Sequence, residues 1–225
     1  MSKIRTISQL QEALDAEIVW RIKEISAFRI AAKANGVNQK TFVRAGVALM
    51  YAHWEGFIKT ASKNYLSYVC NQGHSYRDLK TCFAVFGLKL SLALLTDSRK
   101  SKPSIEAFEF VLGEMDKTAR MSMASAIDTE SNLTSKIFAN IAASIDISTT
   151  RYETKFNMID ESLVRRRNKV AHGEYLDLGL AEFLTLAENI VQVMRDYKTD
   201  LENAATLKAY KRPEAVPGTQ AAVVP

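Results

Sequence analysis

The stretch that decides the fold is IDESLVRRRNKVAHGEYLDL, residues 159–178, where an apolar stripe and a basic run share one helix. At about 100° per residue, Ile159, Leu163 and Val170 fall within about 40° of one another, so they face a core. Gly173 is typical of the residue that follows a helix C-terminus. The pattern predicts a helix that ends just before this glycine, with a core-facing side and a basic side.

The rest of the chain also favours helix. Its 225 residues are 47% hydrophobic and include only 9 Gly and 4 Pro, too few turn residues for an all-β protein. Apolar residues recur at helical spacing. They predict helices over about residues 8–34, 38–70, 76–95, 104–115, 133–145, 151–172 and 178–210. The sequence therefore predicts an all-α bundle, a single domain over residues 1–211 with a flexible C-terminal tail over residues 212–225.

Local signals add detail to this outline. Ser8 with Gln11 three residues later resembles a capping box, and Asn132 is placed to cap the helix that follows it. Residues 116–131 have no clear apolar face, and we expect a mobile loop near the dimer groove there.

Charge and composition narrow the classes of function. The net charge of +5 and pI of about 9.1 allow a polyanionic partner without requiring one. The chain lacks a signal peptide and an apolar run of about 18 residues, so we expect a cytoplasmic protein that does not enter a membrane. Three His and two Cys show no zinc-ligand spacing, and no Gly-rich phosphate loop is present. We therefore expect no metal and no cofactor.

Two residues of the opening stretch have the chemistry for RNA cleavage. Arg167 falls at the edge of the apolar stripe, where a cation needs an anion, a carboxylate or a wet groove. Arginine holds a phosphate bidentately, and His172 is of the type that exchanges a proton near neutral pH. The alternative is an ordinary basic helix end, because cations stabilise helix C-termini and glycine caps them.

Geometry adds a condition to the catalytic interpretation. Positions 167 and 172 are about 140° apart on one helix, so a single chain would struggle to bring both onto one phosphate. Two copies of the helix that meet around a two-fold axis would do so, which predicts a homodimer with a shared site.

The run from Arg167 to His172 resembles the R-N-x-x-x-H motif of HEPN-domain proteins. DAEIVWRIKEI (15–25), LMYAHWEGFIK (49–59), IDTESNL (127–133) and the opening stretch resemble the MAE-type subgroup. The resemblance covers most of residues 10–200. It implies a HEPN-type helical bundle with additional helices that dimerises through the motif helices.

The resemblance also implies an activity, that of a metal-independent endoribonuclease. Arg167 and His172 would be the catalytic pair, with Asn168 orienting them, and the products would carry a 2′,3′-cyclic phosphate and a 5′-hydroxyl. Such proteins include toxins and phage-defence effectors, so an antitoxin or defence-system partner protein is expected besides the RNA substrate. Some members do not cleave RNA, and the alternative is a non-catalytic module that binds a nucleotide or a partner protein.

Residues around the motif have expected supporting roles. Glu55 and Lys59 are spaced as an intrahelical ion pair, or Glu55 pairs with an arginine of the motif helix and holds it in place. Tyr175 either stacks on a base or packs against the protein. The residues expected to bind the RNA substrate are Arg165, Arg166, Lys169 and Tyr175.

Overall fold

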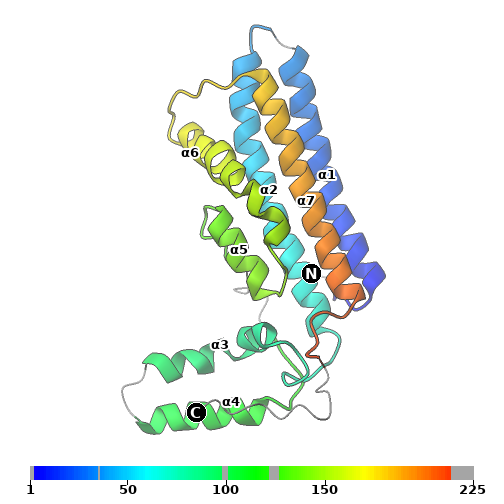
Figure 1. The fold of residues 1–225 in the computed structure, drawn as a ribbon, viewed down its shortest axis with the longest axis vertical. Helices are drawn as coiled ribbons and strands as arrows, with labels where there is room; N and C mark the ends of the chain where they lie inside the picture. The colour runs from blue at the N-terminus through cyan, green and yellow to red at the C-terminus, as the bar shows by residue number, and fades with distance from the viewer. Residues whose placement is uncertain (1–2, 35, 98–100, 122–126, 214–225) are drawn as a thin grey trace.

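The computed structural model describes residues 3–34, 36–97, 101–121 and 127–213, and these residues confirm an all-α fold (Figure 1). Within those ranges there is no β-strand, only two isolated antiparallel bridges, Ser75 with Thr118 and Leu79 with Lys211. No helix in the described part of the chain is long and apolar enough to cross a membrane.

Three long helices lie side by side and form the body of the bundle (Figure 1): α1 (Ile7–Ala34), α2 (Gln39–Cys70) and α7 (Leu180–Thr206). Gly46 on α2 allows a close approach to α7, because a Cβ at this position would lie 2.6 Å from the ring of Phe183. All three helices lie close to where the apolar periodicity predicts them.

The chain from residue 135 to residue 171 forms a series of short helices, most of which pack against the side of α2. They are α5 (Ser135–Ser144), the 3₁₀-helix η1 (Thr150–Lys155), the π-helix η2 (Met158–Val164) and α6 (Arg165–Ala171). The predicted single helix over 151–172 is therefore wrong in detail, since the chain passes through three helix types. A π-helix is rare and frequently occurs at functional sites.

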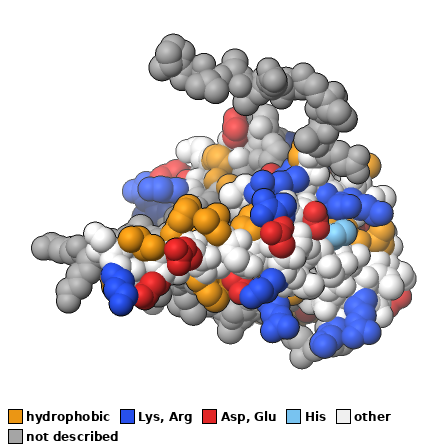
Figure 2. Space-filling model, turned by 90° about the horizontal axis from the view of Figure 1, so that it is seen from below, with side chains coloured by type: hydrophobic (Ala, Val, Ile, Leu, Met, Phe, Trp, Pro, Cys, Tyr) orange, Lys and Arg blue, Asp and Glu red, His pale blue; other side chains and the backbone are white. Residues whose placement is uncertain are grey.

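Helices α3 (Thr81–Asp97) and α4 (Ser101–Glu114) form a hairpin at one end of the bundle (Figure 1). The predicted helix start at residue 76 is wrong, because Tyr76 and Arg77 donate backbone hydrogen bonds to Lys117 and Met115 instead of continuing a helix. Phe108 and Phe110 of α4 are exposed, and Figure 2 shows hydrophobic and charged side chains mixed on the face seen from below.

Two predicted helix caps are displaced along the chain. The capping box of α1 is formed by Thr6 and Gln9, since Thr6 Oγ1 accepts from Gln9 N at 3.1 Å and Gln9 Oε1 accepts from Thr6 N at 3.2 Å. The N-cap of α5 is Thr134, which accepts from Ile137 N at 3.3 Å. Asn132 does not cap this helix, and its side chain has another partner.

The core between α2, α5 and α7 is aromatic. Phe138 contacts Trp54, Tyr152 and Tyr197, with ring centroids 5.1, 5.2 and 5.5 Å away. All four side chains are fully buried. Offset and edge-to-face packing of this kind adds about 0.5–1.5 kcal/mol per pair beyond the buried area. The cluster fixes α5 against α2, and α5 precedes η1, η2 and α6 in the chain.

The weakly patterned segments are partly ordered. In the predicted loop over 116–131, Met121, Ile127 and Thr129 are buried, while residues 122–126 lie outside the described residues. Of the predicted tail over 212–225, Arg212 donates a backbone hydrogen bond to Asp78 O at 2.8 Å, and residues 214–225 lie outside the described residues.

Candidate active site

The motif helix ends in a Schellman motif. Gly173 has φ +73°, its N–H donates to Val170 O at 3.1 Å, and the N–H of Glu174 donates to Lys169 O at 2.9 Å. His172 is the C-cap, with its side chain exposed. Upstream, Ile159 is fully buried, as its position on the apolar stripe predicts. The apolar residues thus anchor the helix, and its end presents the histidine to solvent.

Arg167 lies on the opposite, inner side of α6 and is half-buried. Its guanidinium stacks on Tyr51 of α2, with Cζ 3.7 Å from the ring centroid. Its Nη2 donates to Asn132 Oδ1 at 3.0 Å and to Ser131 O at 3.3 Å. A cation–π contact of this kind is worth about 0.5–2 kcal/mol. No carboxylate in the described part of the chain pairs with Arg167, so its charge is held in place without being neutralised.

The segment that receives Arg167 has an unusual backbone. Glu130 and Ser131 have φ values of +50° and +56°, which non-glycine residues seldom adopt. Leu133 follows, and its N–H donates to the Tyr51 hydroxyl at 2.7 Å while its carbonyl accepts from Trp54 Nε1 at 3.3 Å. Both partners are on α2, so one helix supports the ring beneath Arg167 and the segment beside it.

Tyr51 and Asn132 were not predicted as site residues. The apolar periodicity of α2 assigns Tyr51 to the core, where its ring indeed lies, and Asn132 was predicted to cap α5. Both belong to stretches, 49–59 and 127–133, that carry the HEPN resemblance. The resemblance marks both stretches as part of the family pattern, but it does not predict that Tyr51 and Asn132 contact Arg167.

The carboxylate of Asp160 links the π-helix η2 to α5. Asp160 accepts hydrogen bonds from Ser135 N at 2.7 Å and from Ser135 Oγ at 2.5 Å. It thereby satisfies a free N–H in the first turn of α5, where a negative charge is also favoured by the helix dipole. The contact fixes η2 against α5, the helix that follows Asn132.

The residues expected to bind RNA lie on the outer side of the motif helix. Arg165 pairs with Glu161 at 2.7 Å, and Arg166 pairs with Glu182 of α7. Together with Lys169 they line an open pocket of about 330 Å³ that Leu176 and Asp177 complete. The position suits contact with a phosphate backbone, although two of the three cations are paired with carboxylates in this structure.

Tyr175 is 69% exposed just after the helix end. Its hydroxyl accepts from Lys40 Nζ at 3.5 Å, and Asp177 pairs with the same amine at 3.2 Å. These hydrogen bonds, first that of Asp177 and then that of Tyr175, raise the pKa of Lys40. The tyrosine ring itself is free to contact a ligand.

The expected ion pairs of Glu55 do not form. Neither Lys59 nor an arginine of the motif helix lies within ion-pair distance of this carboxylate in the described residues. Glu55 instead lies close enough to Tyr51 to help raise the pKa of the phenol, which burial raises most. It adds negative potential beside the ring on which Arg167 rests.

Asn168 and His172 have no side-chain hydrogen bond within the described residues. Asn168 therefore orients neither Arg167 nor His172 in this single chain. Arg167 points inward to α2 and His172 is exposed at the helix end, which agrees with the large angle expected between them. One chain does not bring the two predicted catalytic side chains together.

His53, the histidine of α2, lies in the interior of the bundle. His53 is buried, packs edge-on against Trp20 at 5.1 Å, and lies with Nε2 3.1 Å from Glu24 Oε2, outside the direction of a hydrogen bond. Burial lowers the pKa of His53, and Glu24 partly offsets this. No group of three His, Cys, Asp or Glu in the described ranges is placed to hold a metal ion.

Fold and motif together define a protein of the HEPN class, an all-helical bundle with an arginine and a histidine on one short helix. The family model RiboL-PSP-HEPN matches residues 16–203, and the chain belongs to this family. The HEPN assignment is confirmed, while the closer likeness to the MAE-type subgroup stays a prediction. No curated protein and no solved structure gives a significant match.

Proposed function

We propose that this protein is a metal-independent endoribonuclease whose active site forms where the motif helices of two copies meet. Membership of a HEPN family is compatible with ribonuclease activity. The observation that supports the proposal most is the environment of Arg167, which is stacked on Tyr51 and bound by Asn132 yet keeps its positive charge.

The chemistry assigns a separate role to each side chain. The 2′-oxygen attacks the adjacent phosphorus, and its proton leaves to a general base as the P–O5′ bond breaks. The 5′-oxygen takes up a proton, which leaves a 2′,3′-cyclic phosphate and a 5′-hydroxyl. His172 serves the 2′-hydroxyl or the leaving oxygen, and Arg167 stabilises the charge on the phosphorane.

The homodimer completes the site in this proposal. Since Arg167 and His172 project from different sides of α6, a second copy supplies the missing group across a two-fold axis. Asn168, which has no partner among the described residues of one chain, is then available to hydrogen bond across the interface. The pocket lined by Arg165, Arg166 and Lys169 lies beside the motif, where it would hold flanking phosphates.

The proposed role in the cell is that of a toxin or phage-defence effector. A nuclease of this kind needs restraint, so an antitoxin or another defence-system protein is the expected partner.

Incubation with RNA in EDTA tests the proposal. The wild type should cleave an RNA pool and generate ends with a cyclic phosphate, whereas Arg167→Ala and His172→Ala should lose at least about 100-fold in rate. Lys23→Ala, at an exposed position on α1 away from the motif helix, is the matched control and should retain activity. Equal cleavage by all variants would remove the proposed site. Absence of cleavage by the wild type, with RNA or nucleotide binding retained, would favour the non-catalytic alternative.

A further inference from the structure

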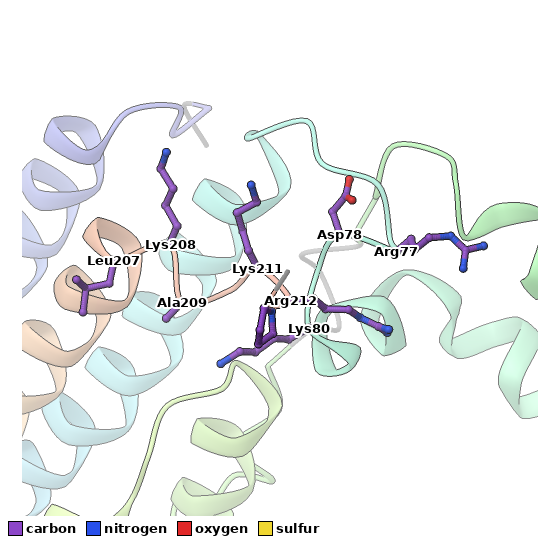
Figure 3. A pocket seen from close by; sticks show the side chains of 9 residues that line it. Arg77, Asp78, Lys80, Leu207, Lys208, Ala209, Lys211 and Arg212 are labelled. Carbon is purple, nitrogen blue, oxygen red and sulfur yellow. The ribbon is translucent and has the colours of Figure 1, made fainter. Parts of the chain in front are cut away.

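A second basic site lies at the other end of α7 from the motif. The chain beyond this helix turns back over residues 77–80, held by hydrogen bonds from Lys80 N to Tyr210 O at 2.9 Å and from Arg212 N to Asp78 O at 2.8 Å. The two segments border an open cleft of about 770 Å³ (Figure 3). We call it the basic cleft, and its charged lining residues are Arg77, Asp78, Lys80, Lys208, Lys211 and Arg212.

The basic cleft carries positive charge that the protein does not neutralise. Arg77 pairs with Asp116, and Lys80 pairs with Asp146. Lys208 and Lys211 form no ion pair in the described part of the chain. Asp78 of the lining accepts from Ser75 Oγ at 2.7 Å and interacts with Lys211 only over a longer distance. Both lysines point the same way from the C-terminal segment (Figure 3). Among the described residues, the guanidinium of Arg212 donates to two neutral groups, Leu79 O at 2.8 Å and Thr81 Oγ1 at 3.3 Å.

The local potential is felt by a neighbouring histidine. Burial lowers the pKa of His74 most, the charge of Lys211 lowers it further, Asp78 opposes this, and Lys208 adds a smaller lowering. Figure 2, which views the molecule from below, shows Lys and Arg side chains on several parts of this face. An open cleft with a cluster of unpaired cations is the electrostatic arrangement that attracts polyanions.

The backbone at Lys208 gives a second, independent indication. The end of α7 is a Schellman motif, with Lys208 N donating to Ala205 O at 3.2 Å and Ala209 N donating to Ala204 O at 2.9 Å. Lys208 takes the left-handed position with φ +52°. Glycine is preferred at this position and occupies it at the end of α6, as Gly173. A lysine here places a cation at the rim of the cleft despite the less favourable backbone.

The lining suits recognition of phosphate groups and not of bases. It contains no aromatic side chain, because Tyr210 is turned inward and packs against Tyr68 at 6.1 Å between ring centroids. Base recognition in RNA relies on stacking, whereas contacts from lysine and arginine to phosphate are independent of sequence. A lining of this kind therefore suits a phosphate backbone better than a base.

We propose that the basic cleft is a phosphate-binding exosite that holds RNA at a distance from the point of cleavage. The inference rests on the proposed function in taking RNA as the polyanion. The 27 residues of α7 separate the cleft from the motif loop by about 40 Å, at about 1.5 Å per residue. B-form DNA has a phosphate roughly every 3.4 Å along each strand, and an A-form RNA helix is shorter along its axis, so a duplex RNA that reaches both sites needs at least about 12 base pairs. The substrate is thus an extended or folded RNA and not a short oligonucleotide.

Binding measurements in an inactive background test the exosite without requiring cleavage. All proteins carry His172→Ala, and fluorescence anisotropy in EDTA follows a labelled hairpin of about 24 base pairs and an oligonucleotide of about 6 nucleotides. Lys208→Gln with Lys211→Gln should weaken hairpin binding at least about tenfold at about 0.1 M salt. It should also reduce the slope of log K against log salt by about 2. The gain in affinity from the short to the long RNA should largely disappear.

Matched variants separate this site from net charge and from stability. Lys23→Gln with Lys102→Gln removes the same charge from exposed positions on α1 and α4, and hairpin affinity should stay within about twofold of the parent. Lys208→Gly should raise the melting temperature, since glycine suits the left-handed position, and should still weaken RNA binding.

Three results would overturn the exosite: unchanged hairpin affinity in the Lys208/Lys211 variant, an equal loss in the control variant, or binding of polyglutamate as tight as that of RNA. The last result would point to an acidic protein partner instead. These outcomes are independent of catalysis, because a protein that cleaves no RNA but loses hairpin binding in the cleft variant would keep the exosite and refute only the nuclease.

Discussion

Arg167 shows how tertiary contacts can hold an arginine side chain without neutralising its charge. Tyr51 supports the face of the guanidinium, and Asn132 accepts from one edge at 3.0 Å. Neither neighbour is a carboxylate, so the charge remains available. Burial beside neutral acceptors also fixes the direction of the side chain before a ligand arrives, which reduces the entropy lost on binding.

Substitutions of Asn132 test this positioning role. Asn132→Ala should lower kcat for RNA cleavage roughly tenfold to a hundredfold, with little change in melting temperature, because the guanidinium loses its orientation. Asn132→Asp should raise KM, because a carboxylate at the same place would neutralise the charge that we propose binds phosphate. Steady-state kinetics against Asn140→Ala, an exposed asparagine on α5, provide the comparison. Wild-type kcat in Asn132→Ala would show that the contact positions nothing.

Tyr51 also has a structural role, which can be tested by removing its hydroxyl group alone. In the wild type, the buried Leu133 N–H donates to the Tyr51 hydroxyl at 2.7 Å. Tyr51→Phe keeps the ring but leaves this N–H without its acceptor. The free energy of unfolding should fall by about 1–3 kcal/mol in urea denaturation. Tyr175→Phe, at an exposed ring, should change it by less than about 0.5 kcal/mol. Equal stability of the two variants would contradict the assigned hydrogen bond.

At the scale of elements, helix ends place the charged groups. The helices α6 and α7 finish in the same Schellman geometry, with Gly173 after His172 in one and Lys208 in the other. The first end presents a histidine, and the second presents a lysine to the basic cleft. Both sites therefore depend on backbone conformations that are sensitive to a single side chain.

Gly173→Ala tests the first of these helix ends. A Cβ at φ +73° costs about 1–2 kcal/mol, so the variant should unfold at lower denaturant concentration. Gly113→Ala is the control, because Gly113 lies in α4 with open space around it and a negative φ. There alanine should stabilise by up to about 1 kcal/mol. The same sign of change in both variants would contradict the assigned conformations.

The contact between α1 and α2 predicts a dependence of stability on pH. Burial holds the pKa of His53 below its usual value of 6.5, against the opposing effect of Glu24 and with a smaller contribution from Arg21. Well above about pH 6.5 His53 is neutral in both the folded and the unfolded state, so its protonation does not reduce the free energy of unfolding. As pH falls below this value, the unfolded chain binds the proton more readily, so stability is lost progressively towards the lower folded pKa.

His53→Gln should therefore reduce the loss of unfolding free energy between pH 7.5 and pH 5.5, a window on either side of roughly 6.5. The variant keeps a hydrogen-bond donor but does not titrate. Urea denaturation at both pH values measures the difference, and His74 leaves a residual fall because its pKa is also lowered. An identical pH dependence in the variant would contradict a neutral, buried His53.

The local pattern predicts the long helices but not the contacts between them. Ile159 and Leu163 are buried as the helical period requires, and the angle between Arg167 and His172 follows from the same period. The π-helix η2 has no sequence signal of its own. The stacking of Arg167 on Tyr51 joins residues more than a hundred positions apart, so it depends on tertiary packing, which periodicity does not contain.

At the scale of the whole molecule, the proposed dimer decides whether there is an active site. The motif helix lies on the outside of the bundle against α2, and His172 is exposed at its end (Figure 1). A partner that docks on this face would place its own arginine and histidine beside them. The basic cleft at the other end of α7 would remain accessible for the rest of the RNA.

Mixing two inactive variants tests the shared site most directly. Arg167→Ala and His172→Ala are each purified, unfolded and refolded together, so that mixed dimers form, and RNA cleavage in EDTA is compared with that of each variant alone. If the site is shared, the mixture should regain activity, because a mixed dimer unites the intact arginine of one subunit with the intact histidine of the other. A mixture that forms mixed dimers yet stays as inactive as its two components would contradict the shared active site.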